Sequence, residues 1–452
     1  AALALTAGIN FFSGAERAVY FPDYETLPYD HFSPNEDIVS DRLRLLKRLE
    51  HEQQMVLVVS VTTLMQKMAP SSYFHGTAFS FKSGQQIKRD ALRDALVQTG
   101  YRSVEQVAHH GEFAIRGNII DIFAMGTDEP FRLDCFDNEL ENIRYFDPDT
   151  QRSYDKLEHI EILPAHEFPF NEDSITRFRQ TWRERFSGNP MSMPVYESIS
   201  NGLVPSGIEN YLPFFFDELG TLIDYLPKHT QSMLIDGTHE AAEAFWQQIV
   251  HRHDQLNHDI ERPILPVTEL YQTVSDCFAD IKTLQTLDPG SRASHLAGTR
   301  KNSAPGLTPG PEQNATQVNM DPGSRASHLT GTALPNLAAN YQQQPALKNL
   351  ASFISGFDGN ITIISETAGR RETLLDMLAA TDLKPKVVNS WHDATQEKLS
   401  ITIGQIAEGF IADKHAVITE TEIFGFTQTP TRRKKASVDP STLIKNLSEL
   451  KV

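Results

Sequence analysis

The sequence predicts a multidomain α/β protein, and three observations support this prediction. The chain has 452 residues, enough for about three domains of ordinary size. Between residues 111 and 152, apolar and polar residues alternate in short runs separated by Gly, Asn, Asp and Pro. Such alternation is typical of half-buried antiparallel strands joined by hairpins. On both sides of this segment, short apolar runs alternate with stretches of helical periodicity, which is typical of α/β domains.

The first 77 residues are predicted to form part of an α/β layer. They open in what resembles the end of a helix, and a short strand follows at Ala18–Phe21. Ser33-Pro34-Asn35-Glu36 places a Pro in a first helical turn and a Glu three residues after a capping Ser, which predicts a helix start. The continuous apolar run 56–61 predicts a strand of the kind that is buried in a parallel sheet.

Residues 78–164 are predicted to form an inserted α+β module. A helix is expected from Arg89 to Thr99, with Leu92 and Leu96 on its buried face, and Gly100 is expected to end it. Three strands are expected after it: 112–116 running into 119–123, then 132–136, and then 142–146. The helix is expected to pack behind these strands.

Side-chain alternation along these strands predicts which residues point away from the core. Leu133 and Cys135 fall on the apolar side of their strand, so that Arg132, Asp134 and Phe136 share the other side. An aromatic ring flanked by arginines on an exposed face is typical of a protein-binding hot spot. The alternative is structural: Phe136 ends a hairpin, and the arginines form exposed ion pairs that contribute little free energy.

The rest of the chain is predicted to contain three parts. Residues 165–286 return to the first domain. Residues 287–333 are rich in Pro, Gly, Ser, Thr and Asn and contain a 13-residue unit, first at 287–299 and again at 320–332, identical at 11 of 13 positions. This unit has almost no apolar face to bury, so we interpret the segment as a duplicated linker without a fold. Residues 334–452 are expected to form a small α/β domain.

Composition excludes several classes of function. A net charge of −18 disfavours non-specific DNA binding as the main activity. Cys135 and Cys277 are too far apart in sequence to indicate a disulfide framework or a metal site. His109 and His110 lack neighbouring ligands at metal-binding spacing. No long apolar run or secretion signal is present, and a reducing cytosol is the expected compartment.

Several segments are candidate nucleotide-binding or catalytic sites, but their residues do not support that function. No phosphate-binding loop of the type G-x-x-x-x-G-K-[ST] occurs in the chain. The strand, turn and helix beginning at Ile361 is interpreted as an ordinary α/β turn. The apolar run 233–235 lies where an ATPase would present an apolar strand ending in Asp-Glu. Asp236 is placed to hold magnesium, but Gly237 replaces the carboxylate that would position water. The basic run 432–435 is interpreted as a solvated loop, with contact to nucleic acid as the alternative.

The motifs around the predicted strands resemble those of a known family. Gly111-Glu112-Phe113-Ala114-Ile115-Arg116-Gly117, Asp121-Ile122-Phe123 and Arg132-Leu133-Asp134-Cys135-Phe136-Asp137 resemble the second domain of the bacterial transcription-repair coupling factors, which is similar to a domain of UvrB. Gly207-Ile208-Glu209-Asn210-Tyr211 is similar to a pentapeptide of UvrB. The likeness covers nearly the whole chain outside the linker.

The resemblance carries specific implications. It implies a degenerate helicase-like, UvrB-like first domain split by an inserted UvrA-docking domain, followed by a small third domain. The family's UvrA-contacting positions fall on Arg116, Arg132 and Phe136, and Arg152 is a weaker candidate. It further implies that the chain is the amino-terminal half of such a factor, either an engineered fragment or a truncated gene product.

The resemblance also predicts what the chain does. It implies recruitment of UvrA to lesions that stall transcription, in the nucleoid-associated cytoplasm, without catalysis, cofactor or metal. ATP, magnesium, RNA polymerase and DNA would be bound by family domains outside this chain. The family is thought to mask the docking face with a carboxy-terminal domain, so constitutive UvrA binding is expected here. Two alternatives remain: a nucleotide-binding or nucleotide-hydrolysing enzyme with a degenerate site near Asp236, and a gene remnant without a role.

Overall fold

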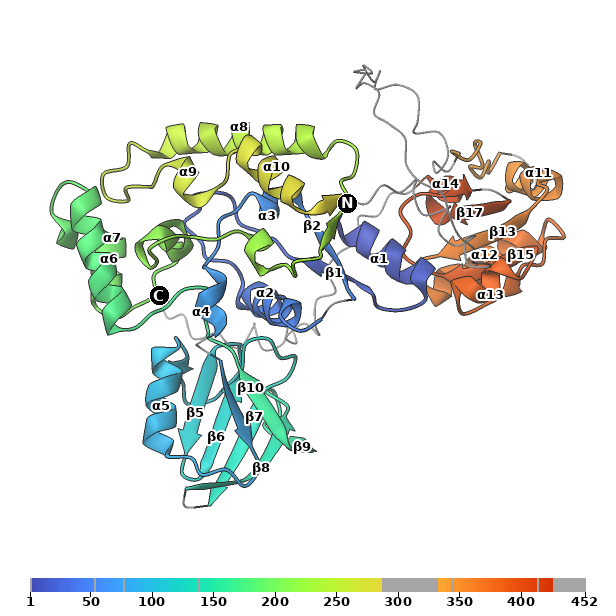
Figure 1. Ribbon diagram of the computed structural model, residues 1–452. Coiled ribbons are helices and arrows are strands. Elements are labelled where there is room, and N and C mark those ends of the chain that lie inside the picture. The colour runs from blue at the N-terminus through green and yellow to red at the C-terminus, as the bar shows by residue number, and fades with distance from the viewer. Residues whose placement is uncertain are drawn as a thin grey trace, which may run out of the picture. The chain divides into compact units, whose positions relative to one another are not determined.

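The computed structural model describes residues 2–52, 54–75, 78–136, 138–286, 332–342, 345–412 and 414–425 (Figure 1). The chain divides into two compact units. One consists of Ala1–Tyr20, Val56–Val58 and Asp288–Val452, and the other of Phe21–Met55 and Val59–Leu287. Both units combine helices with sheets, which confirms the predicted multidomain α/β class. The finer division at residues 77, 164, 286 and 333 stays a prediction.

The larger unit carries most of the helices. Their bounds are α2 Glu36–Leu49, α3 Val61–Leu64, α4 Ser71–His75, α5 Arg89–Gln98, α6 Glu172–Arg185, α7 Pro194–Ser200, α8 Thr238–Leu256, α9 Val267–Leu270 and α10 Val274–Thr283, with 3-10 turns at Pro190–Ser192, Ile208–Phe214 and Leu222–Tyr225. The predicted start of α2 is confirmed, with the difference that Asn35 rather than Ser33 is the capping residue and accepts a hydrogen bond from the Asp37 amide.

A six-stranded sheet in the order β4-β5-β6-β7-β8-β9 forms the centre of the inserted module (Figure 1). Its strands are β4 Arg102–Ser103, β5 Glu112–Arg116, β6 Ile119–Phe123, β7 Phe131–Phe136, β8 Glu139–Phe146 and β9 Ser153–Leu157. The strands predicted at 132–136 and 142–146 are confirmed within a few residues. Segment 112–116 does not run into 119–123 as predicted: the two form separate antiparallel strands, joined by a turn at Gly117, which has a left-handed φ of +61°. Helix α5 lies beside the sheet, its Leu92 and Leu96 are buried, and Gly100 follows it with a left-handed φ of +92°.

Short strand pairs complete the larger unit. Strand β3 (Phe79–Lys82) pairs antiparallel with β10 (His159–Ile162), so the two ends of the inserted module lie side by side. Strand β11 (Gln231–Ser232) pairs in parallel with β12 (Gln285–Thr286). Strands β1 (Ala18–Phe21) and β2 (Val56–Val59), which belong mainly to the smaller unit, form a separate two-stranded sheet.

Two predicted strands differ from the structure. The run 56–61 was expected to be one buried strand, but β2 ends at Val59, Val56 is exposed, and α3 begins at Val61. The Ser60 hydroxyl explains this end, because it accepts a hydrogen bond from the Thr63 amide and so caps α3. The run 233–235 is not a strand, and its three apolar side chains are about half exposed.

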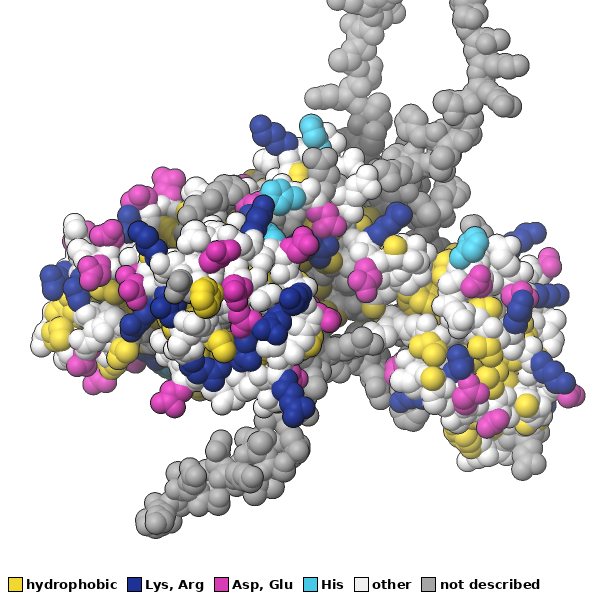
Figure 2. Space-filling view, turned by 90° about the horizontal axis from the view of Figure 1, so that it is seen from below, with side chains coloured by type: hydrophobic (Ala, Val, Ile, Leu, Met, Phe, Trp, Pro, Cys, Tyr) yellow, Lys and Arg dark blue, Asp and Glu magenta, His cyan; other side chains and the backbone are white. Residues whose placement is uncertain are grey.

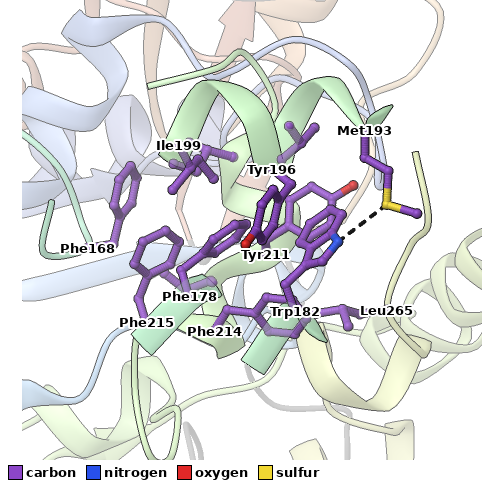
Figure 3. Close-up of a cluster of buried hydrophobic side chains, with 13 residues drawn as sticks. Phe168, Phe178, Trp182, Met193, Tyr196, Ile199, Tyr211, Phe214, Phe215 and Leu265 are labelled. Carbon is purple, nitrogen blue, oxygen red and sulfur yellow. Dashed lines mark hydrogen bonds between the residues drawn. The ribbon is translucent and has the colours of Figure 1, made fainter. Parts of the chain in front are cut away.

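An aromatic cluster forms the core around α6 and α7 (Figure 3). Its buried members are Phe168, Phe178, Trp182, Met193, Val195, Tyr196, Ile199, Ile208, Tyr211, Leu212, Phe214, Phe215 and Leu265. Trp182 is fully buried, and its indole N–H points to the Met193 sulfur at 3.3 Å. This core holds the segment that follows the inserted module in a fixed position.

The smaller unit contains a five-stranded sheet in the order β14-β15-β13-β17-β16, parallel except for β16. The strands are β13 Asn360–Ser365, β14 Lys386–Val387, β15 Leu399–Ile403, β16 Phe410–Ala412 and β17 His415–Thr419. The helices of this unit are α1 Ala2–Ser13, α11 Lys348–Gly356, α12 Ala368–Ala379, α13 Trp391–Thr395 and α14 Glu420–Phe424. The predicted alternation of strands and helices from residue 361 onward is confirmed.

Candidate functional site

The candidate site lies on one face of the six-stranded sheet, which the register of the strands defines row by row. One row across the sheet contains Ala114, Asp121, Arg132, Arg144 and Lys156. The next row contains Arg116, Ile119, Asp134 and Asn142. Phe136 stands one pair further along β7, opposite Glu139. The predicted separation of faces is confirmed, because Leu133 and Cys135 are buried while Phe136 is 62% exposed.

Only half of this face is open. The loop between β4 and β5 covers the other half, where Val104 and Val107 pack on Ala114, Phe123 and Phe146. The loop is held down by the Glu112 carboxylate, which accepts hydrogen bonds at 2.9 Å from the amides of residues 108 and 109. A partner can therefore reach the rows beyond Ala114 but not the rows before it.

Arg132 is the most enclosed of the three predicted contact residues. Its side chain is 12% exposed, and its guanidinium lies 4.7 Å from the centre of the Phe146 ring. Arg132 Nε donates to Asp121 Oδ1 at 2.7 Å, and Nη2 donates to Asp121 Oδ2 at 2.9 Å. Its Nη1 donates to the Gln151 carbonyl at 2.9 Å and to Ser153 Oγ at 3.2 Å. The hydrogen-bonded Asp121 carboxylate raises the pKa of Arg132.

Arg116 shares the same carboxylate but is far more open. Its side chain is 46% exposed and forms an ion pair through Nη2 with Asp121 Oδ2. A longer contact of 3.4 Å joins the same nitrogen to Gln151 Oε1. The structure therefore brings Arg116 and Arg132 together through Asp121, whose side chain is completely buried.

Phe136 belongs to the same face but does not touch the arginine pair. It lies two strands from Arg116 and one residue pair further along, which places their Cα atoms about 12 Å apart at ordinary strand spacing. A shift of register between Asp134 and Cys135 occurs just before Phe136. The three predicted residues thus frame one open strip of the sheet, with Ile119 and Asp134 between them.

Three residues in and beside this strip were not predicted from the sequence: Asp121, Arg144 and Gln151. Asp121 was treated only as part of a motif, although an acid in the apolar strand 119–123 is a signal for a buried ion pair. Arg144 Nε donates to Asp134 Oδ2 at 3.1 Å. Gln151 accepts from Arg116 through its side chain and from Arg132 through its carbonyl. Arg152, the weaker candidate, is exposed in the turn beside Gln151. Figure 2 shows basic and acidic side chains mixed over the visible face of the molecule.

His110, another candidate from the sequence, has hydrogen-bond partners within the fold. His110 is buried, with Nδ1 2.8 Å from Asp37 Oδ1 and Nε2 2.8 Å from the Thr127 carbonyl oxygen, and in both hydrogen bonds the oxygen is the acceptor. Across the described ranges, no group of three or more His, Cys, Asp or Glu side chains is arranged to hold a metal ion. The same ranges contain no helix that is both long and apolar enough to span a membrane. The basic run 432–435 lies outside the described residues.

Neither nucleotide candidate has the geometry of a phosphate site. Asp236 is exposed and follows a loop instead of the predicted strand. At the turn after β13, the buried carboxylate of Glu420 occupies the position that a bound anion would need. Glu420 accepts a hydrogen bond from the Glu366 amide at 3.0 Å and another from Arg370 Nη1 at 2.7 Å. The groups that would meet a phosphate there are therefore already satisfied within the unit.

A second polar cluster joins the early loop of the larger unit to the 207–211 pentapeptide. Ser33 Oγ accepts a hydrogen bond from the Gly207 amide at 2.9 Å and donates to Glu209 Oε2 at 2.8 Å. Asn210 donates to the Asp30 carbonyl at 2.8 Å. Burial raises the pKa of Glu209 to about 7, although the Ser33 hydroxyl opposes this rise. A small cavity of about 50 Å³ lies beside Glu209, between this loop and Tyr271.

Comparison with known proteins agrees with these observations. The family model of the UvrB interaction domain matches residues 79–168, and that of the MFD D3 domain matches residues 353–423. The transcription-repair-coupling factor of Haemophilus influenzae is 38% identical over 438 residues, which are 96% of this chain and 36% of the relative. That of Escherichia coli is 36% identical over 436 residues, 95% of this chain and 36% of the relative.

A more distant relative shows the same relationship. The transcription-repair-coupling factor of Myxococcus xanthus is 31% identical over 310 residues, which are 64% of this chain and 26% of the relative. This chain spans about a third of the length of the first two relatives. Its inserted module coincides with a UvrB interaction domain, and its small α/β sheet coincides with an MFD D3 domain. The chain belongs to the transcription-repair-coupling factor family.

Proposed function

We propose that this chain binds UvrA through the open strip of its six-stranded sheet and thereby recruits UvrA to sites where a lesion has stalled transcription. Arg116, Arg132 and Phe136 are the residues to which we assign this binding. The observation that carries the proposal is the exposed ring of Phe136 on the same face as the Arg116 guanidinium, inside a UvrB interaction domain. Aromatic and arginine side chains are the residue types that dominate binding hot spots.

The electrostatics of the strip favour an acidic partner surface. Of the six charged side chains in its two rows, four are basic (Arg116, Arg132, Arg144 and Lys156) and two are acidic (Asp121 and Asp134). The strip is therefore basic in a chain whose net charge is −18. A basic strip speeds the approach of an acidic surface and sets its orientation.

The proposed activity is binding without catalysis, and we assign no cofactor or metal to this chain. We place its action in transcription-coupled nucleotide-excision repair, inside the bacterial cell. Contacts with RNA polymerase, DNA, ATP and magnesium are assigned to other domains of the family. Incubation with ATP and measurement of released phosphate tests the absence of catalysis, and turnover above the buffer blank would contradict it.

Calorimetric titration of the purified chain with purified UvrA tests the site. Arg116→Ala, Arg132→Ala and Phe136→Ala are each expected to weaken binding by about 1–3 kcal/mol, the range of hot-spot residues. Two matched controls are Phe32→Ala, which removes another exposed ring, and Arg48→Ala, which removes a surface arginine paired with Glu52. Both controls are expected to bind like the unchanged chain. Unaltered affinity in all three site variants would reject the site.

A further inference from the structure

Asp121 is a completely buried carboxylate that two arginine side chains share. Both of its oxygens accept from Arg132, and Oδ2 also pairs with Arg116. A buried carboxylate is costly unless it is paired and hydrogen-bonded. The pairing therefore holds both guanidinium groups against the sheet at one fixed point.

The two arginines differ in the hydrogen-bond donors that they leave free. A guanidinium has five N–H donors. Arg132 makes four hydrogen bonds from Nε, Nη1 and Nη2, all to groups of its own module. Both contacts of Arg116 leave from Nη2 alone, so among the described residues its Nε and Nη1 have no hydrogen-bond partner. Arg116 is thus anchored at one nitrogen and keeps its Nε and Nη1 donors for a partner.

Arg132 also holds the turn that limits the movement of Arg116. Its Nη1 donates to the Gln151 carbonyl, and the Gln151 side chain contacts Arg116 Nη2. Gln151 has a left-handed φ of 59°, a conformation that non-glycine residues adopt at a cost and that needs support from its surroundings. Asp121 and Gln151 thus both contact Arg116 Nη2, and Arg132 in turn holds both of these residues.

We propose that Asp121 is a positioning residue, which holds Arg116 through Nη2 so that the remaining donors, at Nε and Nη1, are left to meet a carboxylate on the partner. This inference rests on the proposed binding of UvrA at the same strip. Arg132 acts mainly from beneath, by completing the neutralisation of Asp121 and holding the 147–153 turn. A planar guanidinium held at one nitrogen loses less freedom on binding than a free arginine side chain.

A double-mutant cycle with UvrA tests this inference. Asp121→Asn keeps the shape of the side chain but removes its charge, and it is expected to weaken UvrA binding about tenfold, equivalent to about 1.4 kcal/mol. In the Arg116→Ala background the same change is expected to alter affinity by less than about twofold, because an effect exerted through Arg116 disappears with Arg116. The matched control is Asp217→Asn, an acid-to-amide change at a carboxylate paired with Arg177.

A second variant avoids any dependence on folding. Arg116→Lys keeps the positive charge at an exposed position but has only one side-chain nitrogen, so it cannot pair with Asp121 through one nitrogen and meet the partner through another. It is expected to weaken binding nearly as much as Arg116→Ala, whereas a site that needs only charge would tolerate it. A merely structural effect of Asp121→Asn would reduce the folded fraction, measured by circular dichroism, and leave the affinity of the folded fraction unchanged.

The outcomes separate this inference from the proposed function. Failure of the unchanged chain to bind UvrA would refute the proposed function. Binding that Asp121→Asn leaves intact, or a tenfold loss that persists in the Arg116→Ala background, would refute only the role of Asp121. Full binding by Arg116→Lys would refute the contact through a second nitrogen of Arg116.

Discussion

The guanidinium of Arg42 is completely buried and is held by Glu167, with Nε 2.6 Å from Oε1. This pair joins α2 to the segment that follows the inserted module. Burial alone would lower the pKa of Arg42, but the adjacent Glu167 carboxylate outweighs it and raises the pKa. The ring of Tyr24 lies 4.1 Å from the guanidinium, and its hydroxyl donates to Glu167 Oε2 at 2.7 Å.

Breaking this pair is expected to destabilise the larger unit strongly. Glu167→Gln leaves the Arg42 charge buried without its counterion, and the loss of unfolding free energy is expected to be about 3–5 kcal/mol. The matched control is Arg44→Ala on the same helix, where the exposed pair with Asp128 is expected to contribute less than about 1 kcal/mol. Urea unfolding followed by circular dichroism measures both. Similar losses for the two variants would contradict the expectation.

The stability of the larger unit is expected to fall as pH rises between about 4.5 and 7, through Glu209. Its folded pKa of about 7 lies above the ordinary value of 4.5, so in this window the folded state keeps a proton that the unfolded state has released. Linkage then lowers stability with rising pH, by up to about 3 kcal/mol. Urea unfolding at several pH values, compared between the unchanged chain and Glu209→Gln, measures this contribution.

The comparison with Glu209→Gln is needed because His166 acts in the opposite direction. Burial lowers the pKa of His166 to about 4, so its contribution is lost as pH falls from 6.5. The difference between the two stability profiles removes the His166 effect and isolates Glu209. A difference that does not change with pH would contradict the assignment.

Gly207→Ala is expected to cost more stability than Gly237→Ala. Both glycines have a left-handed φ, +77° and +83° respectively, so an added Cβ strains both by about 1 kcal/mol. At Gly207 the Cβ would also lie 2.9 Å from the Asp30 carbonyl oxygen, whereas at Gly237 it meets nothing within 4 Å. Thermal unfolding of the two variants measures the additional cost of the Asp30 contact. Equal melting temperatures would show that the loop at Asp30 moves to accommodate the added Cβ.

Arg132→Ala is expected to lower stability more than Arg116→Ala, although both belong to the candidate site. Removal of Arg132 deletes four hydrogen bonds and leaves Asp121 with one partner, which is expected to cost about 2–3 kcal/mol. Arg116 is nearly half exposed, and its removal is expected to cost less than about 1 kcal/mol. Chemical unfolding of both variants distinguishes them. The reverse order would show that Arg116 supports the fold.

The sequence predicted the face of the sheet but not the connections within it. Alternation along 132–136 was enough to place Phe136 outside, because the period of a strand is two residues. Alternation says nothing about which side chains on that face neutralise one another. The role of Asp121 depends on the register between three strands, and the enclosure of Arg132 depends on the distant turn at Gln151.

The missed strands share a physical reason. Strands β4 and β9 are short or polar edge strands, with residues such as Arg102 and Lys156, and they carry no apolar run to detect. The opposite error occurred at Met233, where three apolar residues were compared with the apolar strand of an ATPase but lie in an exposed loop. Apolar residues are common at protein surfaces, so a short run without flanking alternation predicts burial poorly.

The loop held by Glu112 over half of the sheet limits the size of any association at the remaining strip. A partner that used this strip alone would contact only the rows beyond Ala114, and a small contact surface is typical of short-lived complexes. The lifetime of such a complex increases when the partner also attaches at a second site. A module with a small binding strip is suited to transferring a bound partner rather than to retaining it.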